Sequence, residues 1–333
     1  MTALLEDAPE ARRDLSVRPA GADRAFTAVA RGSGALVLLV MALVGLFLGF
    51  RASQALRDAG WGFLTTEEWN PEGGEFGIAA VLSGSVLIAV VGVVVAFPLA
   101  LGTALYISEY APRRLKPLLL SLVDVMAAVP SVVYGLWGLF LLQGQVAGFS
   151  RWLATWFGWF PPFGVQGVDP DDPLASITVY TSSIVIAGIV VGLMVTPIAC
   201  SIMRQVFSQA PVGEREGALA LGATRLGMIR SVVLPFGRGG MIGGMMLGLG
   251  RALGETIAVF LILSQVFDVK VRVLESGGSS VSSLIALRYG EATEFGTSAL
   301  MAAGLALFLM TLVVNVIASS FTTRSRSGQG AEA

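Results

Sequence analysis

The sequence predicts an all-α integral membrane protein, and three observations support this fold class. Only 14% of the 333 residues are charged and 54% are hydrophobic, whereas a soluble domain usually carries about 25% charged residues. The mean hydropathy is +0.76. Residues 76–108, 173–203 and 295–323 contain no Asp, Glu, Lys or Arg, and each run exceeds the ~20 residues that a helix needs to cross a bilayer. These runs lack the alternation of membrane β-strands, so we expect helices.

The apolar runs predict one membrane domain, residues 33–323, that contains six spans. The spans are expected at 33–50, 77–107, 118–143, 177–203, 239–266 and 295–321. We expect the polar residues 1–32 to form a loosely ordered tail and residues 324–333 to form a second, short tail. The first tail is long and no small-x-small cleavage site follows residue 50, so we interpret 33–50 as a retained helix rather than a signal peptide.

Positive charge alternates between the segments that connect the spans. The basic residues of the two tails and of alternate loops are Arg12, Arg13, Arg18, Arg24, Arg31, Arg113, Arg114, Lys116, Arg204, Arg215, Arg225, Arg230, Arg238, Arg324 and Arg326. The remaining loops have fewer basic residues and carry many acids, including Glu67, Glu68, Glu72, Asp169, Asp171 and Asp172. The positive-inside rule therefore predicts that both termini lie in the cytoplasm.

The segment 145–170 contains Trp152, Trp156 and Trp159 at helical spacing. Aromatic residues of this kind are typical of an anchor at the membrane interface. A docking surface for an external partner is the alternative.

Composition also excludes several kinds of chemistry. The sequence contains no histidine, which removes the commonest proton relay and metal ligand and any Ser-His-Asp triad. The two lysines, Lys116 and Lys270, do not follow a glycine, so the chain has no phosphate-binding loop for ATP. The net charge of −1 gives no bulk attraction for nucleic acid. We expect no catalytic residue, metal or cofactor in this chain.

The loop 208–236 carries the most specific pattern, and it falls on the predicted cytoplasmic side. Residues 214–235 read E-R-E-G-A-L-A-L-G-A-T-R-L-G-M-I-R-S-V-V-L-P. We expect two short helices with a turn at Gly222, an N-cap at Thr224, and Pro235 ending the loop before the next span.

This loop resembles the coupling loop of ABC importer permeases, E-A-A-x₃-G-x₉-I-x-L-P. The matching residues are Glu216, Ala218, Gly222, Val232, Leu234 and Pro235, and the sequence departs from the pattern at Gly217 and Val232. The resemblance implies that the loop docks on a separate ATPase subunit, where ATP-Mg would bind. An ordinary amphipathic re-entry loop is the alternative.

Few ionisable residues fall within the predicted spans. Arg251 and Glu255 lie in the fifth span and Asp124 in the third, where a charge costs roughly 2.5–3.5 kcal/mol on insertion scales. At 100° per residue, both fifth-span charges share a face with the glycines at 240, 244 and 248, so we expect an i, i+4 pair that points into a helix interface or pore.

Two roles are open for this pair. The Arg251 guanidinium suits bidentate binding of a tetrahedral oxyanion. Glu255 would hold Arg251 in place or accept a hydrogen bond from a protonated substrate oxygen. The alternative is a structural ion pair.

Asp124 of the third span is expected to pair with Arg251 or Arg238. In the third span, Pro130-Ser131 would loosen the helix and free backbone carbonyls, and Tyr134 follows one turn later.

A narrower resemblance rests on three longer runs. Residues 129–138 (V-P-S-V-V-Y-G-L-W-G), 248–256 (G-L-G-R-A-L-G-E-T) and 105–112 (L-Y-I-S-E-Y-A-P) are similar to phosphate importer permeases of the PstC type. Leu64, Trp69, Pro71 and Phe76-Gly77 resemble the entry segment of the same family. The resemblance implies a six-helix type I ABC importer fold in a bacterial plasma (inner) membrane.

The same resemblance implies partners and a pathway. The partners are a homologous PstA-type permease, a PstB-type ATPase dimer and an external PstS-type phosphate-binding protein. The predicted substrate pathway consists of Arg251, Glu255, Thr256, Asp124, Ser131 and Tyr134. Two alternatives stay open. One is a permease for another oxyanion or small solute. The other is an ion-coupled secondary transporter or channel, which would predict inverted repeats and discontinuous helices and would leave the loop 208–236 unexplained.

Overall fold

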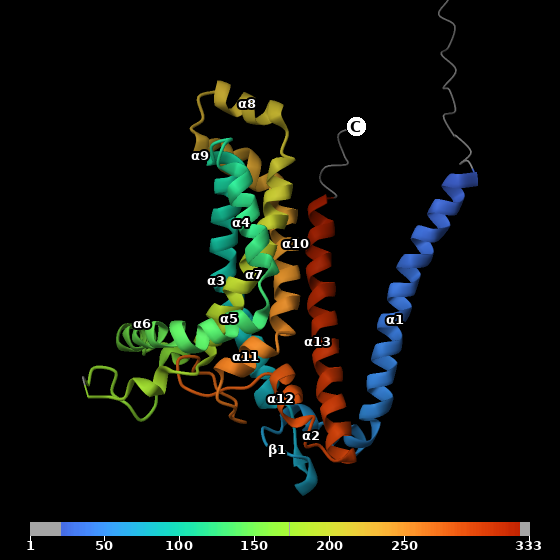
Figure 1. The fold of residues 1–333 in the computed structure, drawn as a ribbon, viewed down its shortest axis with the longest axis vertical. Coiled ribbons are helices and arrows are strands. Elements are labelled where there is room, and N and C mark those ends of the chain that lie inside the picture. The colour runs from blue at the N-terminus through green and yellow to red at the C-terminus, as the bar shows by residue number, and fades with distance from the viewer. Residues whose placement is uncertain (1–20, 173, 327–333) are drawn as a thin grey trace, which may run out of the picture. The chain divides into compact units, whose positions relative to one another are not determined.

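The computed structural model describes residues 21–172 and 174–326, and they are mostly helical (Figure 1). Internal contacts divide the chain into two units, Met1–Phe47 and Leu48–Ala333. The described part of the first unit belongs to helix α1, Gly21–Ala59. Since α1 begins at Gly21, the prediction of a loosely ordered tail is wrong for residues 21–32. The rest of that tail, and residues 327–333 of the second, lie outside the described residues.

The larger unit contains a series of helices and one small hairpin. In chain order these are α2 (Gly62–Thr65), β1 (Trp69–Asn70), the 3₁₀ turn Pro71–Gly73, β2 (Glu75–Phe76), α3 (Ala79–Leu105), the π-helical turn Tyr106–Tyr110, α4 (Lys116–Ala128), α5 (Ser131–Trp137), the π-helical turn Gly138–Leu142, α6 (Gln143–Phe157), the 3₁₀ turns Pro161–Phe163 and Ile177–Tyr180, α7 (Ile184–Ser208), α8 (Val212–Ala220), α9 (Arg225–Met228), the π-helical turn Ile229–Val233, α10 (Leu234–Leu253), α11 (Ile257–Ile262), α12 (Val281–Arg288) and α13 (Glu294–Arg326).

Among the described residues, six helices are long and apolar enough to cross a membrane, as the sequence predicts. They are Gly21–Ala59, Ala79–Tyr110, Ser131–Phe157, Ile184–Ser208, Arg225–Leu253 and Glu294–Ile317. The all-α membrane fold is therefore confirmed, although the predicted spans 118–143, 177–203 and 239–266 are not continuous helices.

The predicted third span, 118–143, is broken. Helix α4 ends at Ala128, Val129 and Pro130 are extended with ψ of 128° and 141°, and α5 begins at Ser131. Proline lacks an N–H and disfavours helical backbone in the residue before it, which explains the break. In Figure 1, α4 runs along α7, whereas α5 and α6 turn across the bundle.

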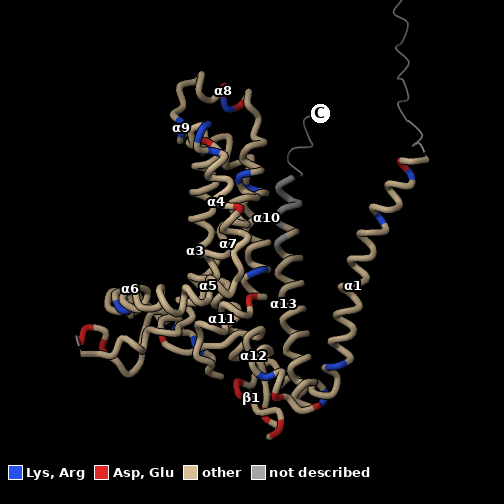
Figure 2. The backbone as a smooth tube through the Cα atoms, in the orientation of Figure 1, with Lys and Arg blue, Asp and Glu red and all other residues tan. Residues whose placement is uncertain are grey.

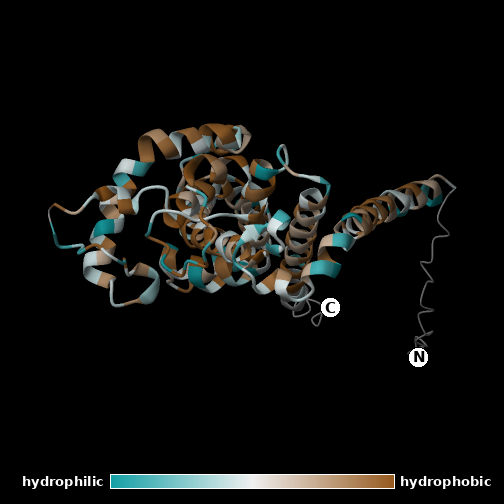
Figure 3. Cartoon of the chain, turned by 90° about the horizontal axis from the view of Figure 1, so that it is seen from below, coloured by the Kyte–Doolittle hydropathy of each residue, from teal (hydrophilic) through white to brown (hydrophobic). Residues whose placement is uncertain are grey.

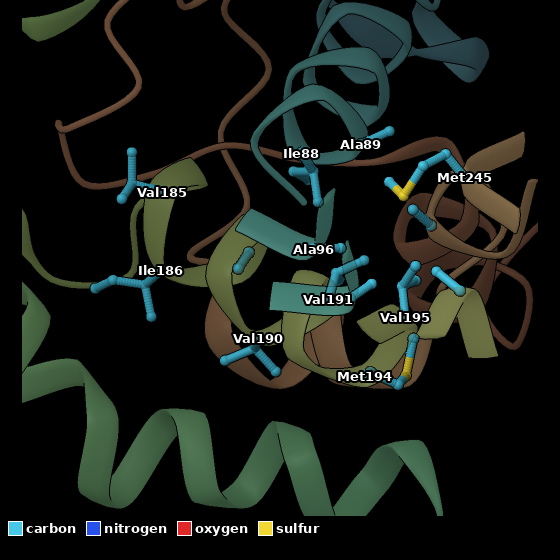
Figure 4. Close-up of a cluster of buried hydrophobic side chains, with 14 of the residues drawn as sticks. Ile88, Ala89, Ala96, Val185, Ile186, Val190, Val191, Met194, Val195 and Met245 are labelled. Carbon is cyan, nitrogen blue, oxygen red and sulfur yellow. The ribbon is translucent and has the colours of Figure 1, made fainter. Parts of the chain in front are cut away.

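Helix α7 lies at the centre of the larger unit. It packs against α3, α4 and α10, and α10 also packs against α13. Branched side chains of α7, including Val190, Val191 and Val195, are almost fully buried. They lie against small and branched side chains of α3, such as Ala96 and Ile88 (Figure 4). Since lipid is as apolar as these side chains, close fit rather than water exclusion holds the helices together.

A second buried cluster closes one end of the unit. Phe76 of the β1–β2 hairpin makes edge-to-face contacts with Phe63 and Phe295. Ser298 of α13 donates to the Arg51 carbonyl at 2.7 Å and accepts from the Ala55 N–H at 3.3 Å. The Ser298 hydrogen bonds fix the start of α13 to the last turns of α1.

Hydrophobic residues occur along much of the length of the helices (Figure 3). On α3, Val86, Val90, Val94 and Phe97 are 40–65% exposed and lie along one stripe, which is typical of a helix that faces lipid or another membrane helix. Most charged residues lie near the ends of the helices, and few lie between (Figure 2).

Two glycines of α3 provide a matched test of this packing. A Cβ at Gly84 would lie 2.0 Å from the Ser279 carbonyl oxygen, whereas a Cβ at Gly102 would have nothing within 4 Å. We expect Gly84→Ala to destabilise the folded chain by about 1–3 kcal/mol because backbone must move. Gly102→Ala should be neutral or slightly stabilising. Thermal unfolding in detergent measures both, and equal stability of the two variants would contradict this packing.

Candidate functional site

The loop 208–236 folds as the sequence predicts over its first half. Helix α8 ends at Ala220 and α9 begins at Arg225. Gly222 has a φ of +87°, a conformation that other residues rarely adopt. The Thr224 hydroxyl oxygen accepts from the Gly227 N–H at 3.1 Å and caps α9. Both predicted local signals are therefore confirmed.

The predicted end of the loop at Pro235 is wrong. A π-helical turn, Ile229–Val233, joins α9 to α10, and Pro235 lies in the first turn of α10. Proline is tolerated there because its missing N–H falls where the hydrogen-bond pattern changes register. The chain is consequently helical from Arg225 to Leu253.

The pattern residues of the loop divide into an outer and an inner group. Glu216 and Gly222 are exposed, whereas Ala218 and Leu234 pack against the main core. Four apolar side chains near them are exposed although they lie on a polar loop: Val212 (66%), Leu219 (46%), Leu221 (91%) and Leu226 (50%). An apolar surface of this kind at one end of the bundle indicates a site for another protein.

An ion pair fastens α8 to the end of α3. The Arg215 guanidinium lies 3.3 Å from the Glu109 carboxylate, with 19% and 6% of the two side chains exposed. Arg215 also donates to the Phe207 carbonyl, and Arg225 lies 5.6 Å above the Tyr110 ring. Sequence reasoning missed Glu109 and Arg215. Their opposite charges in two loops predicted to lie on the same side of the membrane were the available signal.

The predicted i, i+4 pair in the fifth span does not form. Helix α10 ends at Leu253, so Glu255 does not continue the face that carries Arg251, and no ion pair joins them in the described residues. Glu255 is 8% exposed. Its carboxylate accepts from the Ala258 N–H at 3.3 Å, and its carbonyl accepts from the Ser282 hydroxyl at 2.7 Å. These two bonds hold the chain out of the helix at Gly254–Thr256.

The glycine ridge of α10 faces α7, as expected. A Cβ at Gly240, Gly244 or Gly248 would contact Val206, Ala199 or Val195 respectively. Arg251, in contrast, is exposed at the end of α10. Its position in the last turn of α10 is favourable, because the helix dipole places negative charge there.

Arg251 lines a cavity of about 490 Å³ between three helices. The other lining residues are Ile198 of α7, Met246, Leu247 and Gly250 of α10, and Thr311 and Asn315 of α13. The predicted pathway residues therefore do not all meet. Arg251 belongs to this cavity, whereas Glu255 belongs to the buried helix break.

The remaining predicted residues lie around the break between α4 and α5. The Tyr134 hydroxyl donates to the Met126 carbonyl at 3.0 Å, so it satisfies one of the carbonyls that Pro130 frees. Ser131 is half-buried at the start of α5, and Thr256 is half-buried beside Glu255. Asp124 is exposed on α4 and forms no ion pair in the described residues, so its predicted pairing is wrong.

The two broken segments pack directly on each other. A Cβ at Gly135 would lie 2.9 Å from the Ala258 Cα, and one at Gly138 would lie 2.7 Å from a Val190 methyl group. Helices α5 and α11 thus cross closely. The two sequence runs that contain Tyr134 and Glu255 are therefore parts of one structural unit.

Comparison with known proteins identifies the family. Residues 96–327 match the family model described as "Binding-protein-dependent transport system inner membrane component". The chain belongs to this family.

Similar full-length proteins support the assignment. The chain is 38% identical to "Phosphate transport system permease protein PstC 2" of Mycobacterium bovis, over 91% of this chain and 93% of the relative. It is 35% identical to "Phosphate transport system permease protein PstC" of Xylella fastidiosa, over 96% of this chain and 95% of the relative. A "Probable phosphate transport system permease protein PstC" of Methanocaldococcus jannaschii is 36% identical, over 87% of this chain and 90% of the relative.

Solved structures with low sequence identity share the fold. One is a chain of a bacterial alginate ABC transporter in complex with an alginate-bound periplasmic protein, with a TM-score of 0.58 at 13% identity. The match covers 90% of this chain and 95% of the transporter chain. A chain of the inward-facing MetNI methionine ABC transporter has a TM-score of 0.52 at 12% identity. The match covers 74% of this chain and 95% of the transporter chain. The predicted type I importer fold is confirmed.

Discontinuous helices do not separate the transporter classes here. They are expected in an ion-coupled secondary transporter, yet the described part of this chain also contains helix breaks, at Val129–Pro130 and at Gly254–Thr256. Backbone breaks are tolerated at membrane depth wherever protein covers them. The family match, not helix continuity, therefore decides between the classes.

The Glu109–Arg215 pair gives a test of how the loop is held. We expect Glu109→Gln to leave the Arg215 charge unpaired and to speed amide hydrogen exchange in residues 212–228 by about tenfold, which corresponds to about 1.4 kcal/mol. Hydrogen–deuterium exchange with mass spectrometry measures this directly.

The matched control is Glu214→Gln, which removes the same charge from an exposed position on α8. Exchange in that variant should stay at the wild-type rate. Equal protection in the wild type and in Glu109→Gln would show that the ion pair does not hold the loop.

Proposed function

We propose that this chain is the PstC-type permease subunit of an ATP-driven importer of inorganic phosphate. The observation that carries the proposal is the end-to-end similarity, at 33–38% identity, to proteins named as phosphate transport permeases. The cavity beside Arg251 supports it, since a guanidinium within a membrane-spanning helix suits a tetrahedral oxyanion.

ATP hydrolysis would take place on partner chains. In this proposal a PstB-type ATPase dimer binds ATP-Mg, and this chain contributes no catalytic residue or cofactor. The exposed apolar residues around Leu221, together with Glu216 and the bare backbone at Gly222, would fit a groove on the ATPase. A homologous PstA-type permease would complete the pathway, and an external PstS-type protein would deliver phosphate.

The proposed orientation follows from charge. Basic residues flank α8 and α9: Arg204 near the end of α7, Arg230 in the π-helical turn and Arg238 near the start of α10. We propose that this end lies in the cytoplasm of a bacterial cell, with the chain in the plasma (inner) membrane and both termini inside. The tryptophans of α6, Trp152 and Trp156, are 51% and 66% exposed, and we propose that they anchor the opposite end at the interface.

The proposed mechanism is alternating access. Phosphate enters an outward-open cavity, binds near Arg251, and leaves when ATP-driven movement of α8 and α9 switches the open side. Switching requires that phosphate or the ATPase binds one state more tightly than the other. Of the predicted pathway residues, we assign Arg251 to anion contact. We assign Glu255, Thr256, Ser131 and Tyr134 to the two helix breaks that adjoin it, and Asp124 to the exposed side of α4.

The pathway assignment is tested by charge removal at Arg251. In vesicles with the assembled complex, Arg251→Gln should lower ATP-dependent ³²P-phosphate uptake at least about tenfold, because one charged hydrogen-bonding group is lost. Arg251→Lys should retain part of the activity, since it keeps the charge but loses bidentate geometry.

The outcomes separate two claims. Normal uptake by an assembled Arg251→Gln complex would show that Arg251 serves structure only. A wild-type complex that hydrolyses ATP but takes up another solute and not phosphate would refute the substrate assignment.

The docking surface is tested by a pair of leucines. Leu221 on the α8–α9 turn is 91% exposed and Leu174 in the opposite loop is 93% exposed. We expect Leu221→Ser to reduce co-purification of the ATPase severalfold, because an apolar contact is lost. Leu174→Ser makes the same chemical change on the other side and should leave ATPase recovery unchanged. Equal recovery from both variants would remove Leu221 from the interface.

A further inference from the structure

Two polar side chains in the middle of α13 lie beside Arg251. Thr311 and Asn315 are four residues apart, so they share one face of α13. Both line the cavity that contains Arg251. Helix α13 belongs to an uncharged run of residues, 295–323. Polar groups in such a run are costly and usually mark a pathway or a helix contact.

Asn315 lies close to the backbone of α10. A Cβ at Gly250 would lie 3.7 Å from the Asn315 Oδ1 and 3.9 Å from its Nδ2. The amide therefore approaches α10 at the residue that precedes Arg251. The Asn315 side chain is exposed and has no hydrogen-bond partner among the described residues, so its donors and acceptor are available to a ligand in the cavity.

The hydroxyl of Thr311 has a different role. It donates to the Phe308 carbonyl at 2.8 Å. Because its one proton is used in this bond, the oxygen can offer only lone pairs to a ligand. The cavity thus combines a group that only donates, Arg251, a group that does both, Asn315, and an oxygen that only accepts, Thr311.

We propose that Thr311, Asn315 and Arg251 form one binding site that selects a protonated tetrahedral oxyanion. The proposal rests on the proposed function and extends it to selectivity. Arg251 and the Asn315 amide donate to the ionised oxygens, and the Thr311 oxygen and the Asn315 carbonyl accept from an X–OH group. Phosphate and arsenate retain a proton near neutral pH, whereas sulfate does not. Sulfate would leave the acceptors unpaired and bring its own lone pairs against them.

Direct binding is the decisive measurement, because an external binding protein would otherwise set the selectivity of uptake. The assembled complex of permeases and ATPase, purified without the binding protein, is titrated with ³²P-phosphate and competed with arsenate and with sulfate. We expect arsenate to compete and sulfate to compete at least about tenfold more weakly, since sulfate cannot donate a hydrogen bond.

Two variants and one control test the residues. Asn315→Leu should weaken phosphate binding about tenfold. Thr311→Val, which keeps the shape of the side chain, should weaken phosphate binding severalfold and narrow the difference between phosphate and sulfate. Thr297→Val makes the same change near the start of α13, away from the cavity, and should bind as the wild type does.

Several results would contradict this binding site. Wild-type affinity in both cavity variants would overturn it, and so would an equal loss of phosphate and sulfate binding in Thr311→Val. If Asn315→Leu fails to assemble, Asn315 contacts another helix, and Thr311→Val still tests the acceptor role. A wild-type complex that imports phosphate but shows no saturable binding would overturn this site alone. Absence of phosphate import would instead refute the proposed function.

Discussion

The close crossing of α3 and α7 is the constraint on which the rest of the structure depends. A Cβ at Gly192 would lie 2.8 Å from the Gly92 carbonyl oxygen, and one at Gly188 would lie 2.5 Å from Val91. These backbones can approach only because glycine has no side chain, and in a bilayer such contact replaces the hydrophobic effect as the source of association. Helix α7 is then free to receive the glycine ridge of α10 on its other side. The position of Arg251 therefore follows from two successive glycine contacts.

Polar groups occur within this apolar framework where the helical hydrogen bonds stop. At the α4–α5 break, Tyr134 satisfies the Met126 carbonyl, and after α10 the Glu255 carboxylate and the Ser282 hydroxyl satisfy the chain that leaves the helix. An unpaired backbone group in lipid costs several kcal/mol, so each break needs such partners. Because α5 packs on α11 through Gly135, the breaks support each other. Glu255 is thus fixed by hydrogen bonds, which leaves Arg251 without a carboxylate to neutralise it.

The sequence could predict the features that depend on neighbouring residues. Gly222 and Thr224 determined the turn between α8 and α9, and uncharged length determined the spans. It could not predict that α10 ends at Leu253, because the partner that holds Glu255 out of the helix, Ser282, lies 27 residues further along the chain. The Glu109–Arg215 pair was also difficult to predict, because its two residues lie more than 100 positions apart in the chain and only the fold brings them together. Thr311 and Asn315 lie about 60 residues further along the chain than Arg251 and outside the runs that resemble a known family, so only the packing of α13 on α10 places them beside it.

The helix that carries Arg251 also carries part of the exposed loop. Since the π-helical turn Ile229–Val233 absorbs the proline, one helix runs from Arg225 to Leu253, a length of about 40 Å at 1.5 Å per residue. Its first turn belongs to the exposed loop and its last turn carries Arg251. In the proposed mechanism, movement of the loop would reach Arg251 through this helix, because no non-helical residue separates the two. The helix ends at Leu253, and Glu255 is bonded to Ala258 and Ser282, so the break separates the helix that carries Arg251 from the segment that holds Glu255.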